Sequence, residues 1–90
     1  MKLEQTSSFQ RAYKRLHKGQ RKEVNQAIKA LMEDPLLGEM KVGDLAGIRI
    51  HKFRMNKQLT LLAYIYAEEI LTLTLLTLGT HENFYRDLKR

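Results

Sequence analysis

Residues 48–78, IRIHKFRMNKQLTLLAYIYAEEILTLTLLTL, decide the fold. Polar and apolar residues alternate in IRIHKFRM, as they do in a half-buried strand. LTLLAYIY and ILTLTLLTL are nearly continuous apolar or threonine-rich runs, which suit central strands. The intervening turns fall at residues 56–58 and 67–69. Because connections of about three residues join only antiparallel neighbours, the segment predicts a three-stranded antiparallel meander.

The residues before the meander predict two helices. Thr6, Ser7 and Ser8 are candidate N-caps, Gly19 is a plausible stop for the first helix, and Pro35 lies beyond the second. The apolar stripes are Phe9, Ala12, Tyr13 and Leu16 in the first helix, and Val24, Ala27, Ile28 and Leu31 in the second. Two helices joined by so short a turn form an antiparallel hairpin, which must cover the apolar face of the meander.

Three further segments complete the predicted α+β fold. Residues 34–47, DPLLGEMKVGDLAG, hold the only proline and three of the five glycines, so they predict an irregular connection. Lys2–Gln5 predicts an edge strand, and Glu82–Leu88 predicts a short C-terminal helix. Since 90 residues is the size of one compact unit, we expect residues 1–90 to form a single domain.

Composition excludes several classes of protein. The 43% of hydrophobic and 29% of charged residues are ordinary for a globular chain. No cysteine is present, which excludes disulfide frameworks, thiolate metal sites and thiol catalysis, and fits a reducing cytoplasm. The start has no apolar signal region, and no apolar stretch is long enough for a membrane helix. We therefore expect a cytoplasmic protein that does not enter a membrane.

The charge is strongly positive and unevenly distributed. The net charge is +6, and the first 33 residues carry eight Lys or Arg against three acids. Residues 41–57 carry five basic residues against one acid. Such a surface attracts polyanions, of which nucleic acid is the commonest, with an acidic protein or an anionic lipid as alternatives. The plainer interpretation is a solvated surface that only keeps the protein soluble.

Histidine, tyrosine and basic residues are the candidates for chemistry, since neither metal-ligand spacing nor a phosphate-binding glycine loop is present. If Thr80 caps a terminal helix, the helix dipole and nearby cations disfavour the imidazolium form of His81, and a neutral imidazole accepts a proton. Tyr85, one helical turn later, can stack on a base or donate a hydrogen bond. His51 is a second titrating group. The strand cations suited to a phosphate are Arg49, Lys52 and Arg54.

Together these groups suit cleavage of RNA without a metal or any other cofactor. The ribose 2′-OH must lose a proton, the leaving 5′-oxygen must gain one, and the phosphorane needs positive charge around it. Each residue also has a structural explanation: His81 could cap or pack the tail, and Tyr85 could be an aromatic residue at the core edge. In a regular strand His51 and Lys52 point to opposite faces, so both meet one substrate only if the strand twists or bulges.

The order of elements resembles that of the RelE/ParE superfamily of toxins from type II toxin-antitoxin modules. KVGDLAGIRIHKFR (residues 41–54) is similar to the family's entry into the sheet, and LGTHENFY (78–85) is similar to the ending of YafQ-like ribonucleases. The resemblance implies metal-free cleavage of mRNA in the ribosomal A site. It assigns acid/base chemistry to His81, base stacking or proton donation to Tyr85, and a further role to His51. Lys52 and Arg54 fall where RelE-like members place phosphate-binding or base-activating cations. Arg49, and Arg86 in the tail, are further candidates for binding RNA phosphate.

The sequence also departs from the ribonuclease pattern. Many members carry an arginine in the second meander strand, where this chain has Leu61. ParE-like members share the fold, lack the ribonuclease residues and poison DNA gyrase, so fold alone does not separate the two activities. A non-catalytic basic binding domain is a third interpretation. For either toxin the resemblance implies a cognate antitoxin that buries part of the helical hairpin and covers the basic groove.

Overall fold

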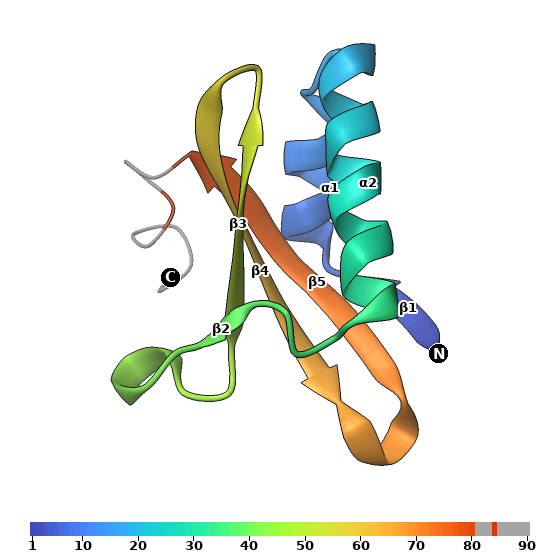
Figure 1. Cartoon of the computed structure of the whole chain (residues 1–90), viewed down its shortest axis with the longest axis vertical. Coiled ribbons are helices and arrows are strands. Elements are labelled where there is room, and N and C mark those ends of the chain that lie inside the picture. The colour runs from blue at the N-terminus through green and yellow to red at the C-terminus, as the bar shows by residue number, and fades with distance from the viewer. Residues whose placement is uncertain (81–83, 85–90) are drawn as a thin grey trace.

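The computed structural model describes residues 1–80 and Phe84. Two helices lie together on one face of a five-stranded sheet whose order is β1-β5-β4-β3-β2 (Figure 1). The strands are β1 (Lys2–Gln5), β2 (Glu39–Met40), β3 (Arg49–Met55), β4 (Gln58–Ala67) and β5 (Thr72–Thr80). The helices are α1 (Ser7–Lys14) and α2 (Lys18–Glu33), with short 3₁₀ turns at Gly43–Leu45 and Glu68–Ile70. The predicted α+β architecture is confirmed.

The antiparallel meander is confirmed in strands β3, β4 and β5. Arg49 pairs with Tyr64 and Met55 pairs with Gln58, so the first hairpin closes through the two residues Asn56 and Lys57. Both have positive φ, 52° and 66°, which matches the twist of a two-residue hairpin turn. β4 and β5 pair from Thr60 with Thr80 to Ala67 with Thr72, with one irregularity in register between Ala63 and Tyr64.

The sheet is wider than the meander. β1, the predicted edge strand, is confirmed and pairs in parallel with β5. β2 was not predicted: two residues of the supposedly irregular connection pair with Ile50 and Arg49 of β3. A strand of two residues carries no periodicity of its own, so only its partner strand defines it.

The helical hairpin is confirmed, but one of its predicted boundaries is wrong. Thr6 caps α1 by accepting a hydrogen bond from the Phe9 amide at 3.1 Å. Gly19 does not end α1, which stops at Lys14; Gly19 lies in the first turn of α2. Arg21 closes the end of α1 instead, because its guanidinium donates to the carbonyls of Tyr13 and Lys14 at 3.4 and 2.9 Å. No described helix has the length and apolarity to cross a membrane.

Apolar side chains are buried on both faces of the sheet. The larger cluster lies between the sheet and the helices and includes Phe9, Val24, Leu31, Met55, Leu62, Tyr64, Leu73, Leu75 and Leu78. The smaller cluster lies on the opposite face, which we call the open face, and consists of Ile50, Leu61, Ala63 and Phe84. The predicted C-terminal helix at residues 82–88 lies outside the described residues apart from Phe84.

Candidate functional site

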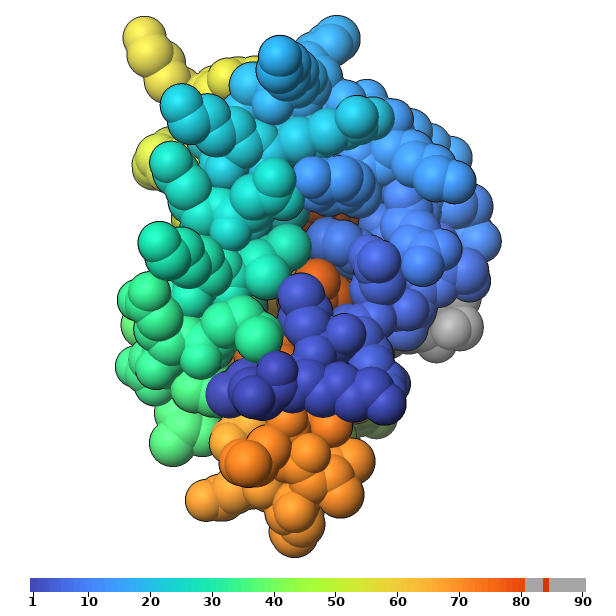
Figure 2. All heavy atoms as spheres, turned by 90° about the vertical axis from the view of Figure 1, so that its right-hand side faces the viewer, coloured from blue at the N-terminus to red at the C-terminus, as the bar shows by residue number. Residues whose placement is uncertain are grey.

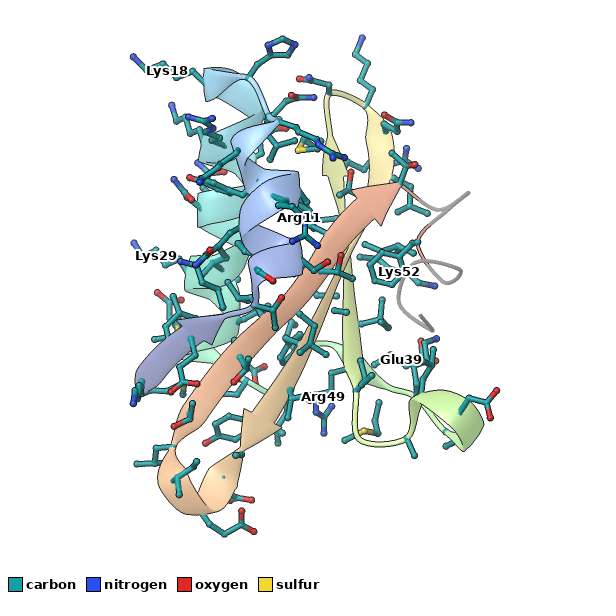
Figure 3. The ribbon with its side chains drawn as sticks, turned by 180° about the vertical axis from the view of Figure 1, so that it is seen from behind. Arg11, Lys18, Lys29, Glu39, Arg49 and Lys52 are labelled. Carbon is teal, nitrogen blue, oxygen red and sulfur yellow. The ribbon has the colours of Figure 1, made fainter. Side chains whose placement is uncertain are left out.

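The open face carries two exposed cations. Lys52 and Arg54 alternate along β3 with His51 and Phe53, so they share a face with the buried Ile50. Lys52 projects on the side of the sheet away from the helices (Figure 3). Arg54 donates to the Lys57 carbonyl at 3.2 Å, whereas no partner is found for the Lys52 ammonium among residues 1–80 and 84. These two side chains give the face its positive charge.

Phe84 packs on the same face. It is 2% exposed and belongs to one cluster with Ile50, Leu61 and Ala63. A Cβ added to Gly79 would lie 3.8 Å from its ring, so Phe84 lies over the end of β5. Phe84 is thus buried on the face that bears Lys52. The three predicted site residues of the tail, His81, Tyr85 and Arg86, lie outside the described residues.

His51 lies on the other face of the sheet. Its ring stacks on Phe53 with centroids 5.8 Å apart and planes 17° from parallel, and it pairs across strands with Leu62 of the helix-covered core. Burial lowers the pKa of His51. The pairing of β3 with β4 runs without a bulge, so His51 and Lys52 point to opposite faces and the structure does not bring them together.

Arg49 is engaged in holding the α2–β2 connection. Its Nη1 donates to the carbonyls of Gly38 and Leu36 at 2.8 and 3.3 Å. The fully buried Tyr64 hydroxyl donates to the Pro35 carbonyl at 2.7 Å and accepts from the Gly38 amide at 2.9 Å. Burial raises the pKa of Tyr64, which keeps the phenol protonated as a donor. The apolar run LTLLAYIY predicted a central strand that contains Tyr64, but it held no sign of this hydrogen-bonding role.

The centre of the open face is apolar. Leu61, where many ribonuclease members carry arginine, is 0% exposed and lies beneath Phe84. Thr77 and Ala63, which pair across β4 and β5, add no charge beside it. Positive charge on the described part of this face therefore comes from β3 and not from the strand beside it.

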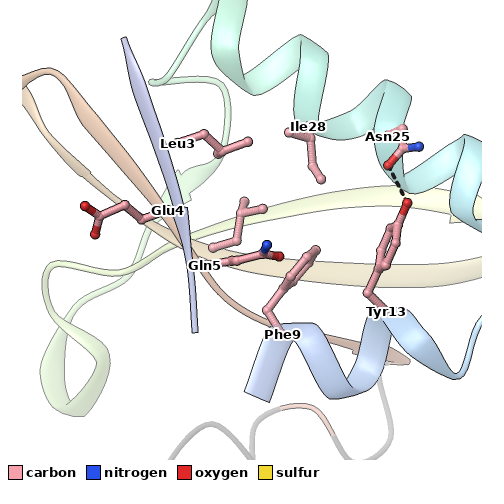
Figure 4. A pocket seen from close by; sticks show the side chains of 8 residues that line it. Leu3, Glu4, Gln5, Phe9, Tyr13, Asn25 and Ile28 are labelled. Atoms are coloured by element: carbon pink, nitrogen blue, oxygen red, sulfur yellow. Dashed lines mark hydrogen bonds between the residues drawn. The ribbon is translucent and has the colours of Figure 1, made fainter. Parts of the chain in front are cut away.

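A cavity of about 270 Å³ opens on the helix side, between β1 and the two helices (Figure 4). Its apolar floor is formed by Phe9, Ile28 and Leu75, and Glu4, Gln5 and Asn25 stand at its polar side. The Tyr13 hydroxyl donates to Asn25 Oδ1 at 2.9 Å and so fixes one wall. Among residues 1–80 and 84, no group of three His, Cys, Asp or Glu side chains is placed to hold a metal ion.

Sequence comparison identifies the family. The profile of the ParE-like toxins of type II bacterial toxin-antitoxin systems matches residues 3–89. The chain belongs to this ParE-like toxin family. No curated protein sequence matches the toxin significantly. The fold of the toxin is found in several solved structures, each with less than a quarter of its residues identical, so they support the architecture and not a particular activity.

Three of these structures illustrate the likeness. The toxin-antitoxin complex RelBE2 from Mycobacterium tuberculosis has a chain with 21% identity and a TM-score of 0.77, covering 89% of this toxin and 96% of that chain. The YoeB/ParE toxin from Agrobacterium tumefaciens has 23% identity and a TM-score of 0.73, covering 90% and 99%. The intact RelBE complex of E. coli has a chain with 15% identity and a TM-score of 0.72, covering 90% and 96%.

Proposed function

We propose that the toxin is a ribosome-dependent, metal-free mRNA endonuclease acting from its open face in the cytoplasm. The observation that carries this proposal is the burial of Phe84 on the face that presents Lys52 and Arg54. His81 directly follows the last residue of β5, and Tyr85 directly follows Phe84. The two candidate acid/base residues thus lie within three residues of Phe84 in the sequence.

The proposed reaction needs three contributions from the chain. His81 removes the proton of the ribose 2′-OH, whose oxygen attacks the adjacent phosphorus while the bond to the 5′-oxygen breaks. Tyr85 stacks on a base or supplies the proton that the leaving 5′-oxygen takes up. Lys52, Arg54 and Arg86 stabilise the extra negative charge of the phosphorane. His51 and Arg49 are left out because the first lies on the opposite face and the second holds the α2–β2 connection.

A reconstituted translation reaction tests this function. Purified toxin is expected to produce new mRNA 5′ ends within translated codons, and His81→Ala is expected to lower cleavage by about 10²-fold or more, the usual contribution of a general acid or base. His17→Ala is the matched control, because His17 is exposed on the helix side. Equal cleavage by wild type and the His81→Ala and Tyr85→Phe variants would overturn the proposal.

A second activity, poisoning of DNA gyrase, is favoured by one observation. The buried Leu61 leaves the middle of the open face without the cation that many ribonuclease members carry there. Without a cation at this position, the face is less suited to stabilising the phosphorane of RNA cleavage. A supercoiled-plasmid gyrase assay run beside the translation reaction distinguishes the two, since a gyrase poison yields trapped double-strand breaks and leaves mRNA intact.

We also propose a cognate antitoxin as partner. Relatives of the same fold were solved as toxin-antitoxin complexes, including those of E. coli and M. tuberculosis. The cavity between β1 and the helices offers such a partner an apolar anchor point, with Phe9 and Ile28 at its floor. Co-expression with a small acidic neighbouring gene product tests this: the pair is expected to co-purify and to relieve growth arrest. Ile28→Lys, which places a charge in the cavity, is expected to weaken the complex.

A further inference from the structure

The helical hairpin bears a second cationic surface, apart from the open face. Residues 7–33 contain seven basic side chains and two acidic ones, so most of the net charge of +6 lies there. Neither helix has an acidic residue in its first turn. The two ion pairs found among residues 1–80 and 84, Lys2–Glu4 and Lys41–Glu39, both lie outside the hairpin. No ion pair within the described residues therefore neutralises the positive charge of the hairpin.

Three lysines form a row along α2. Lys18, Lys22 and Lys29 are exposed and follow one another at spacings of four and seven residues, which keeps them on one side of the helix. The helical rise separates them by about 6 Å and about 10 Å along the axis. Lys18 and Lys29 both project from the outer side of α2, away from Lys52 (Figure 3). We call these three residues the lysine row.

The lysine row borders a shallow groove. The groove has a volume of about 800 Å³ and is lined by Tyr13, Lys18, Gly19, Arg21, Lys22, Asn25, Gln26 and Lys29. Figure 2 looks onto this side of the molecule, where the side chains of α2 stand out from the surface. Arg21 is held by two carbonyls and by the Tyr13 ring, 5.5 Å from its guanidinium carbon. The lysines are therefore the cations of the groove that remain available to a ligand.

We propose that the lysine row binds the phosphate backbone of a nucleic acid, independently of sequence. Every exposed large hydrophobic residue of the described chain lies outside residues 7–33, and Tyr13, the aromatic residue that lines the groove, is half-buried beneath Arg21, so this surface offers no exposed large apolar anchor of the kind that protein partners use. A nucleic-acid strand carries a charge about every 3.4 Å and meets each lysine in any register. An acidic peptide needs carboxylates at matched positions.

This inference goes beyond the proposed cleavage and needs no catalytic residue. The row lies on α2, whereas Lys52 lies across the sheet from the helices, so one molecule presents two separate cationic surfaces. A toxin that acts on a nucleic-acid-containing target can hold that target with the hairpin while the open face contacts the reacting segment. Such a second contact raises affinity without changing sequence preference.

Fluorescence anisotropy with a labelled single-stranded DNA of mixed sequence tests the proposal. DNA has no 2′-OH and the assay has no ribosome, so its outcome is independent of cleavage. The triple variant Lys18→Gln/Lys22→Gln/Lys29→Gln is expected to lose about tenfold or more in affinity at low salt. Its plot of log affinity against log salt is expected to be less steep by about 2, since each phosphate that a lysine neutralises adds about 0.7 to the slope.

The matched control removes the same charge elsewhere. Lys2→Gln/Lys41→Gln/Lys57→Gln is expected to change affinity by less than a third as much, with circular dichroism confirming that both variants are folded. Equal losses of affinity in the two variants would show that net charge alone attracts DNA, and would overturn the proposal. Displacement of the DNA by poly-glutamate at a lower charge concentration than by unlabelled DNA would also overturn it, in favour of an acidic protein partner.

Discussion

At the scale of single residues, Gly38 shows how a buried hydroxyl constrains the chain. A Cβ at this position would lie 2.7 Å from Tyr64 Cε1 and 2.8 Å from the hydroxyl, too close for either atom. The same hydroxyl accepts the Gly38 amide, so the ring cannot move aside without losing that bond. Glycine is required here for close approach and not for an unusual φ.

We predict that Gly38→Ala lowers the free energy of unfolding by about 1–3 kcal/mol, the usual cost of an overpacked site. Gly19→Ala is the matched control, because nothing lies within 4 Å of a Cβ at Gly19 and alanine favours the helix. That control is expected to be neutral or stabilising. Urea unfolding of both variants measures the difference, and equal effects would contradict the role given to Tyr64.

The His51 imidazole predicts a pH dependence of stability. Since burial lowers its pKa in the folded state, the folded protein favours the neutral ring. The contribution of the neutral His51 ring to the free energy of unfolding is fully present above the pKa of the unfolded state, about 6.5. It is lost as the pH falls through the lower pKa of the folded state. We expect His51→Gln to flatten the fall in unfolding free energy below about pH 6.5, measured by urea unfolding over a series of pH values. A slope equal to that of the wild type would show that His51 does not titrate differently on folding.

At the scale of elements, the β3–β4 turn carries backbone strain. Asn56 and Lys57 both have positive φ, which asparagine tolerates and lysine does not. We predict that Lys57→Gly raises the free energy of unfolding by about 0.5–1 kcal/mol, because the relief of strain exceeds the added entropy of the unfolded chain. Lys57→Ala keeps the strain and is expected to give no gain. Thermal unfolding of the two variants provides the comparison. An equal gain in stability with alanine would show that loss of the lysine charge, and not relief of backbone strain, stabilises the protein.

At the scale of the whole molecule, Phe84 joins the C-terminal segment to the sheet. Its cluster with Ile50, Leu61 and Ala63 lies on the open face, across the sheet from the core that the helices cover. A terminal segment can detach without unfolding the rest of the protein. We therefore expect the burial of Phe84 to matter more for the proposed cleavage than for the stability of the core.

We predict that Phe84→Ala lowers the proposed cleavage by at least tenfold while the melting temperature falls only slightly, because removal of the ring releases the tail and leaves the core closed. Ile70→Ala is the control, since Ile70 is 69% exposed at the distant β4–β5 turn. Hydrogen exchange is expected to show faster exchange after β5 in the Phe84 variant alone. Cleavage by Phe84→Ala at the wild-type rate would show that the proposed activity does not depend on the packing of Phe84.

The sequence by itself determined the helices and every strand except β2. The 3.6-residue and two-residue periods identified α1, α2 and the meander because each reflects one buried side of its own element, and short turns fixed which strands pair. Only the tertiary structure decided which face of β3 the helices cover, and this separated His51 from Lys52 and gave Arg49 to the α2–β2 connection. Alternation shows which residues of a strand share a face, but not which of the two faces the helices cover. Phe84 and Leu61 are in one cluster although they lie far apart in the sequence, so no local sequence pattern predicts that they pack together.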